Sequence, residues 1–320
     1  MTPKRILLLA GLAAVVYVGF SVFVFNSVDL PEMGATTVAW VVLAAVLQIG
    51  SKWPFGLLFR ESAREVDAEI RPFSAFRAAL VGAGVARLIP AGGAITPVAM
   101  SWTVRNEAKG TAGAALRTVL LNYSALVVMT GAGLLIARPN EGAQFASISL
   151  TVLAPIGVIV GIALMFGSGM LGSITKFFPR FLRERLESSV VNHLPGLESQ
   201  FYIWARLGLE AATLGIVLNA FGIDIGPVQT AAAFGVGSLV GGLPGTPGGL
   251  GVTEAGLVLI LEAYGFAAAN TLAPVLVFRL VSYWVPAALG FWAGGMTFLR
   301  SDAAKEVVED RDESRRSSNL

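Results

Sequence analysis

Several charged side chains lie within or beside strongly apolar runs of this sequence. Arg279 lies nine residues into one such run, and Arg117 lies near the start of another. Arg87 precedes a break rich in proline and glycine, and Glu254 follows a second break of this kind. A charged side chain at the centre of a membrane helix costs about 2.5–3.5 kcal/mol on insertion scales, so these four residues are candidates for a binding site.

The chemistry open to these residues is the recognition of charged groups. For Arg279 we consider a headgroup phosphate as ligand, because guanidinium can bind two oxygens at once, or a structural ion pair with Glu254 or Glu210. Glu254 could bind a proton or an amine-bearing headgroup, or neutralise Arg279. Arg206 and Glu210 have the i, i+4 spacing of a pair on one helix face. Arg117 could line the same site or extend to the cytoplasmic surface.

The second break, GGLPGTPGGLGVTEAG (residues 241–256), contains seven glycines and two prolines in sixteen positions. Such backbone must be buried in protein or line a wet cavity at membrane depth, because hydrocarbon offers it no hydrogen bonds. The following helix would direct its positive N-terminal end at an anion such as a phosphate. The alternative is that the glycines only allow close helix packing. The candidate substrate-binding residues are Arg279, Gly245, Thr246, Gly248, Gly249, Gly251, Glu254, Arg117, Arg87 and Pro90.

The amino-acid composition indicates whether the elements that position these residues lie in water or in a membrane. The chain of 320 residues is 55% hydrophobic and 14% charged, with a mean hydropathy of +0.71, which predicts an integral membrane protein. The absence of cysteine excludes disulfides, thiolate metal sites and cysteine nucleophiles. A net charge of +2 does not suggest a nucleic-acid partner. We see no catalytic constellation, metal site or cofactor motif, and we therefore expect a protein that is not an enzyme.

Hydropathy predicts an all-α membrane protein with two broken segments. Proline and glycine interrupt two apolar regions near the centre, at 78–104 and 229–263. We predict that each region forms two half-length helices that enter the membrane and return on the same side. The other apolar runs are long enough to cross the bilayer. We expect six transmembrane helices, at 6–26, 34–50, 114–137, 146–167, 201–222 and 270–296.

Charge placement predicts the topology. With the N-terminus in the cytoplasm, 18 of the 23 Lys and Arg fall in cytoplasmic segments, among them Lys52. The re-entrant hairpins, with tips at Pro90 and Pro244, then enter from opposite faces. We expect an inverted repeat in a membrane domain over 1–300, with halves of about 1–137 and 146–300. Residues 301–320 would form a disordered cytoplasmic tail. We therefore expect a multi-pass protein of the cell membrane with both termini in the cytoplasm.

Two segments carry a family resemblance. PGTPGGLGVTEAGLVLILEAYG and the later FRLVSYWVPAALG are similar to the signature of the lysylphosphatidylglycerol synthase transmembrane-region family, a flippase-like membrane domain. The resemblance implies movement of lipids with charged or glycosylated headgroups, or service to the enzymes that make them. We expect no counterpart of the cytosolic aminoacyltransferase domain that the best-known members carry, and therefore no lysyl transfer.

The resulting functional hypothesis is a lipid flippase or scramblase for a phosphate-bearing phospholipid or a polyprenyl-phosphate glycolipid. Its partners would be membrane lipids with anionic headgroups, and a lipid-modifying enzyme could accompany it. Two alternatives stay open: a secondary transporter of a small polar solute, and a non-transporting membrane partner of a lipid-modifying enzyme or glycosyltransferase.

Overall fold

The computed structural model describes residues 19, 34–88, 93, 95–140, 153–166, 195–242 and 248–299, and no strand occurs among them. The predicted all-α class is confirmed for this part of the chain. The predicted first span, apart from Gly19, and the predicted tail lie outside the described residues, as do Pro90 and residues 243–247.

The described helices include one at each predicted apolar segment between residues 34 and 296, and Lys52–Arg64 is an additional helix. The N-terminal set is α2 (Ala35–Gly50), α3 (Lys52–Arg64), α4 (Pro72–Leu88), α5 (Thr96–Thr103), α6 (Ala112–Ile136) and α8 (Ala154–Phe166). The C-terminal set is α11 (Leu197–Ala220), α12 (Pro227–Gly241), α13 (Val252–Ala263), α14 (Ala268–Arg279), the π-helical turn η5 (Leu280–Trp284), α15 (Val285–Gly290), the π-helical turn η6 (Phe291–Gly295) and α16 (Met296–Leu299).

Four of the described helical stretches are long and apolar enough to cross a membrane: Ala35–Arg64, Ala112–Ile136, Leu197–Ala220 and Ala268–Gly294. Apolar side chains on α2 and α8 are exposed, including Trp40, Val46 and Ile159, as expected for helices that face lipid. These features support a multi-pass membrane protein. The count of six spans and the re-entrant geometry remain predictions.

The predicted span over 34–50 corresponds to α2, which ends at Gly50, and a turn at Ser51 leads directly into α3. Lys52, which we expected in a cytoplasmic segment, is almost completely buried within the protein. The reason is a tertiary contact, since the ammonium of Lys52 forms an ion pair with Glu210. A neutralised charge does not have to leave the protein interior.

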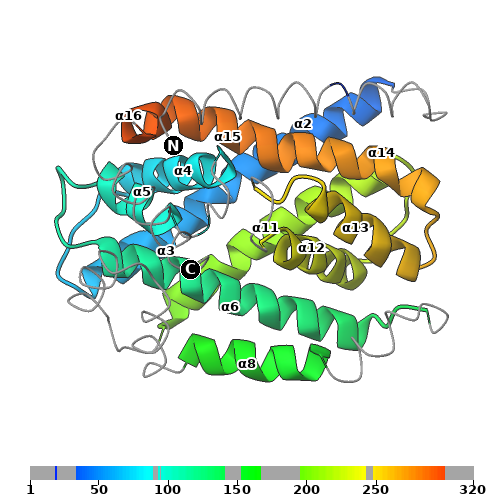
Figure 1. Ribbon diagram of the computed structural model, residues 1–320, viewed down its shortest axis with the longest axis horizontal. Helices are drawn as coiled ribbons and strands as arrows, with labels where there is room; N and C mark the ends of the chain where they lie inside the picture. Colours follow the sequence, from blue (N-terminus) through cyan, green and yellow to red (C-terminus); the bar gives the residue numbers. More distant parts are fainter. Residues whose placement is uncertain are drawn as a thin grey trace, which may run out of the picture.

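Two pairs of short helices pack as hairpins. Helix α4 packs on α5, and α12 packs on α13. Helix α4 also contacts α15 from the C-terminal set, while α12 contacts α6 from the N-terminal set. In Figure 1 both hairpins lie between the long α14–α15 segment and α6, and α11 crosses behind α12 and α13. This reciprocal packing is the arrangement expected of an inverted repeat.

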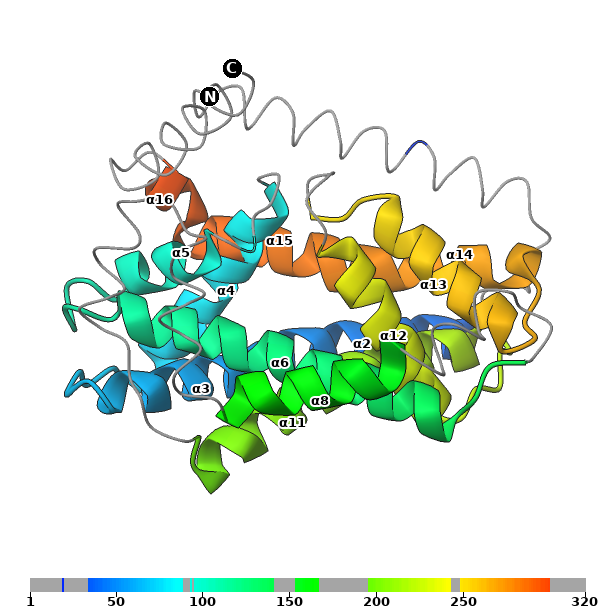
Figure 2. The same ribbon diagram turned by 60° about the horizontal axis from the view of Figure 1, so that its bottom comes forward.

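Small residues allow these helices to approach closely. A Cβ added to Gly290 would overlap the carbonyl oxygen of Leu80, and one added to Gly84 would lie 2.8 Å from the Cα of Gly290. A Cβ added to Gly235 on α12 would similarly overlap the hydroxyl of Thr130 on α6. Helix α8 lies along the outer side of α6 (Figure 2). Close packing therefore explains several glycines, but those at the second hairpin tip have a different environment.

Candidate functional site

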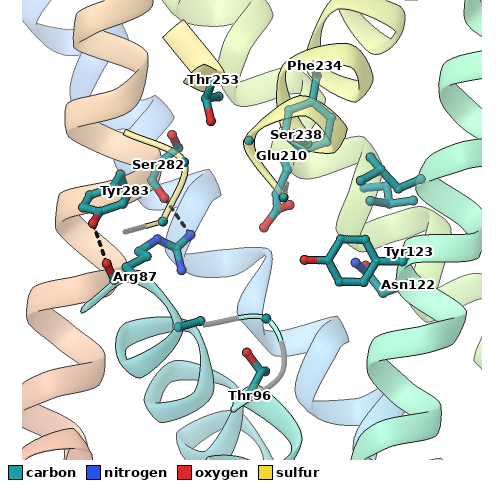
Figure 3. A pocket seen from close by; sticks show the side chains of 18 of the residues that line it. Arg87, Thr96, Asn122, Tyr123, Glu210, Phe234, Ser238, Thr253, Ser282 and Tyr283 are labelled. Carbon is teal, nitrogen blue, oxygen red and sulfur yellow. Dashed lines mark hydrogen bonds between the residues drawn. The ribbon is translucent and has the colours of Figure 1, made fainter. Parts of the chain in front are cut away.

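A cavity of about 240 Å³ lies between the two hairpins and the long helices around them. Figure 3 shows Arg87, Glu210 and Tyr123 pointing into this space from different helices. The first hairpin contributes Ala86, Arg87, Gly93 and Thr96, and the second contributes Phe234, Ser238, Gly241, Gly242, Gly248, Gly249 and Thr253. The long helices contribute Gln48, Phe55, Val119, Asn122, Tyr123, Leu126, Arg206, Leu207, Glu210, Phe278, Arg279, Ser282 and Tyr283.

Arg87 attaches the first hairpin to the π-helical turn η5. Its guanidinium donates to the carbonyl oxygens of Ala83 at 2.6 Å and Ser282 at 2.8 Å. The hydroxyl of Tyr283 donates in turn to the carbonyl oxygen of Arg87 at 2.6 Å (Figure 3). None of the described carboxylates forms an ion pair with Arg87. Its charge is therefore available to a ligand in the cavity.

Arg279 holds the second hairpin tip. Its Nε donates to Glu254 Oε1 at 3.0 Å, and its Nη2 donates to the carbonyl oxygen of Gly248 at 3.1 Å. The other carboxylate oxygen of Glu254 accepts the amide of Gly251 at 2.8 Å. The ion pair that the sequence left as one alternative for Arg279 is thus present. Because Arg279 also lines the cavity, this pair does not exclude a ligand contact.

The glycines of the tip are required by its backbone. Gly248, Gly249 and Gly251 have φ of +55°, +70° and +82°, a region that other residues rarely adopt. A Cβ at Gly248 would also overlap the ring of Tyr283. Two amides at the start of α13 are already bonded within the chain, Gly251 to Glu254 and Thr253 to the Gly249 carbonyl oxygen. An anion at this site would therefore be bound more strongly by the cationic side chains than by the N-terminus of α13.

A second group of charges surrounds Glu210. The carboxylate binds Lys52 and lies 3.3 Å from Arg206, so the i, i+4 pair predicted from the sequence is confirmed. Arg206 also donates to the side-chain oxygen of Asn122, and its guanidinium lies 4.4 Å from the centre of the Phe55 ring. Arg206 and Glu210 line the cavity, and Lys52 is buried beside them.

The charge around the cavity is positive on balance. Arg87, Arg206, Glu210 and Arg279 line it, and Lys52 and Glu254 bond directly to members of that group. Four cations thus accompany two carboxylates, and the local excess is two positive charges. At low dielectric such an excess attracts an anion strongly. The described residues contain no cluster of three His, Asp or Glu side chains able to hold a metal ion.

The remaining candidates fall elsewhere. Arg117 is buried and forms an ion pair with Glu65, and it is not among the residues that line the cavity. It does not extend to the surface, as one alternative proposed. Pro90, Gly245 and Thr246 lie outside the described residues.

Sequence reasoning missed Gln48, Lys52 and Asn122 as residues of this region. A signal was present, because Gln48 and Lys52 have i, i+4 spacing and so share a helix face. The same face carries Ala44 and Phe55, which are buried. Polar residues on a face that is otherwise buried indicate a buried polar site, and the cytoplasmic assignment of Lys52 obscured this pattern.

The chain is similar in sequence to known membrane proteins. Residues 7–290 match the model of a protein family described as the lysylphosphatidylglycerol synthase TM region. The chain is also similar to a protein from Methanothermobacter thermautotrophicus described as a UPF0104 membrane protein. The two are 26% identical over 305 residues, and the match covers 84% of this chain and 88% of the relative.

Proposed function

Because the chain belongs to the lysylphosphatidylglycerol synthase TM region family, we propose that this membrane protein moves lipids with anionic headgroups between leaflets. The observation that carries the proposal is the positively charged cavity between the two hairpins. Broken helices whose tips meet at a polar cavity are the usual substrate site of transporters built from inverted repeats.

The size of the cavity favours a headgroup rather than a whole lipid. Pockets for drug-sized ligands have volumes of about 300–1,000 Å³, and this cavity is smaller, at about 240 Å³. A phosphate with a small substituent fits such a space, while the acyl chains would stay in the surrounding lipid. The exposed apolar faces of the outer helices suit that arrangement.

The cations have different roles in this proposal. Arg87 binds the phosphate, because only backbone carbonyls among the described residues accept from its guanidinium. Arg279 and Glu254 hold the tip at Gly248 and Gly251, so that the cavity keeps its shape. Arg279 can contribute a further phosphate contact, since its side chain lines the cavity.

The test is lipid movement in reconstituted vesicles with Arg87→Gln. Loss of a charge-assisted hydrogen bond costs about 1.5–3 kcal/mol, so we expect movement of labelled anionic phospholipids to slow by roughly 10- to 150-fold. Arg105→Gln is the matched control, because Arg105 is exposed and stacks on Trp102 outside the cavity. Size-exclusion profiles would verify that both variants are folded.

The same assay separates the alternatives. Wild-type protein that moves no lipid of the anionic panel would contradict a flippase and favour a membrane partner of a lipid-modifying enzyme. Uptake of a soluble anion without lipid movement would favour a solute transporter. An Arg87→Gln variant that is as active as wild type would show that Arg87 does not bind the transported ligand.

A further inference from the structure

The π-helical turn η5 interrupts the last long helix of the described chain between α14 and α15. Here the amide of Val285 donates to the carbonyl oxygen of Leu280, whereas an α-helix would bond this amide to Val281. Single π-helical turns inside α-helices often occur at functional sites. Conversion of the turn to α-helical bonding would rotate the two parts of the helix against each other by roughly 100°, the rotation of one residue. The turn therefore has the geometry of a hinge.

The two parts of this helix pack on different hairpins. Before the turn, α14 packs on α13 of the second hairpin (Figure 2). After the turn, α15 packs on α4 of the first hairpin, where Gly84 and Gly290 allow a close approach. Because close packing joins each pair of helices, a rotation at η5 would move the two hairpins relative to each other. The cavity lies between these hairpins, so its width depends on the turn.

Tyr283, within the turn, contacts both hairpins. Its hydroxyl donates to the carbonyl oxygen of Arg87 on the first hairpin at 2.6 Å (Figure 3). Its ring packs against Gly248 of the second hairpin, where an added Cβ would overlap the ring. Two arginines support these contacts, since Arg87 donates to the carbonyl oxygen of Ser282 at 2.8 Å and Arg279 donates to that of Gly248 at 3.1 Å. One residue of the turn thus holds both hairpins.

We propose that Tyr283 is the positioning residue of a gate. Its contacts hold both hairpins against η5 and keep the cavity closed, and a rotation at the π-helical turn releases the two hairpins together. Tyr283 is 3% exposed and lines the cavity, so the contact closes the cavity on the side of the last helix. The gate rests on the proposed function, because its opening would admit the anionic headgroup, but it does not depend on which headgroup enters.

Labelling of a cysteine in the cavity measures opening of the gate without requiring transport. The chain contains no natural cysteine, and Val119→Cys places a thiol at a cavity-lining position that is 8% exposed. Its reaction with a water-soluble maleimide would be followed in the purified protein in detergent. Tyr283→Phe keeps the ring and removes the hydrogen bond to Arg87. We expect this change to speed labelling about fivefold to tenfold, the factor that corresponds to loss of one hydrogen bond.

Two matched controls separate a gate from general loosening of the fold. Tyr264→Phe removes a buried hydroxyl that has no partner among the described residues and does not line the cavity, so it should not change labelling of Val119→Cys. Thr213→Cys places a thiol at a fully buried position that does not line the cavity, and Tyr283→Phe should leave its labelling unchanged. Equal acceleration at both thiols would overturn the gate, and so would unchanged labelling of Val119→Cys.

Distances between pairs of spin labels test the hinge. Labels at Phe73 on α4 and Leu259 on α13 span the turn, whereas the pairs Phe73 with Ala288 and Leu259 with Asn270 each lie within one packed unit. All four positions are exposed. In Tyr283→Phe we expect a second distance population for the spanning pair only. A second population within a unit, or none across the turn, would contradict a hinge at η5.

Two further outcomes separate the gate from the proposed function. If vesicles show no movement of anionic lipids while the labelling and distance results hold, the flippase proposal fails and the gate stands. If Tyr283→Phe alters lipid movement but leaves labelling and distances as in wild type, the gate is overturned and the proposed function stands.

Discussion

The ion pair between Arg279 and Glu254 ties the second hairpin to the last long helix. Each side chain is 9% exposed, and the pair is extended by the bonds from Arg279 to Gly248 and from Gly251 to Glu254. Arg279→Gln removes the positive charge and leaves a buried carboxylate beside the hairpin tip. We therefore expect this variant to lose folding stability.

The magnitude follows from the burial of both partners. Removing one partner of a buried ion pair costs about 3–5 kcal/mol, because the other charge stays desolvated. The lower end, about 3 kcal/mol, applies here, since Glu254 keeps the amide of Gly251. Arg279→Gln with Glu254→Gln leaves no unpaired charge, so the double variant should be about 2–3 kcal/mol more stable than the sum of the single losses predicts.

The assay is equilibrium unfolding in mixed micelles for wild type, both single variants and the double variant. The pair Arg64 and Glu61 provides a matched control, because it has the same 3.0 Å separation but is far more exposed, at 46% and 26%. The same cycle there should give a coupling of less than about 1 kcal/mol.

Additive losses within about 0.5 kcal/mol at Arg279 and Glu254 would refute this reasoning. An Arg279→Gln variant with wild-type stability but impaired lipid movement would instead favour the other role predicted from the sequence, a direct phosphate ligand. A double variant that is stable and transports normally would show that neither charge is essential.

Two other predictions concern packing and topology. Gly290→Ala should destabilise the protein by about 1–3 kcal/mol, because the added Cβ would overlap the carbonyl oxygen of Leu80. Gly208→Ala should stabilise helix α11 slightly, because the added Cβ would enter open space. Unfolding in mixed micelles compares the two variants, and equal effects on stability would contradict the packing argument. In the cysteine-free background, Lys109→Cys should be labelled only from the cytoplasmic side and Arg138→Cys only from the outside, and labelling of both from one side would exclude α6 as a membrane-crossing helix.

Much of the secondary structure could be predicted from the sequence. The broken region 78–104 corresponds to α4 and α5, and the region 229–263 corresponds to α12 and α13. These breaks depend on local chemistry, because proline removes a backbone donor and glycine adopts positive φ without strain. The predicted pairing of Arg206 with Glu210 was equally local, since residues one helical turn apart are neighbours whatever the fold.

The sequence alone determined that this is a membrane protein with long apolar helices and two interrupted segments. These features depend on the length of each apolar run and on the positions of proline and glycine, which act on the neighbouring backbone. Only the tertiary structure decided which charges meet. Lys52 is bonded to Glu210, 158 positions away, and Arg87 contacts Ser282, 195 positions away. Electrostatic attraction and hydrogen bonding depend on separations of a few ångströms in space, and sequence distance does not fix these separations.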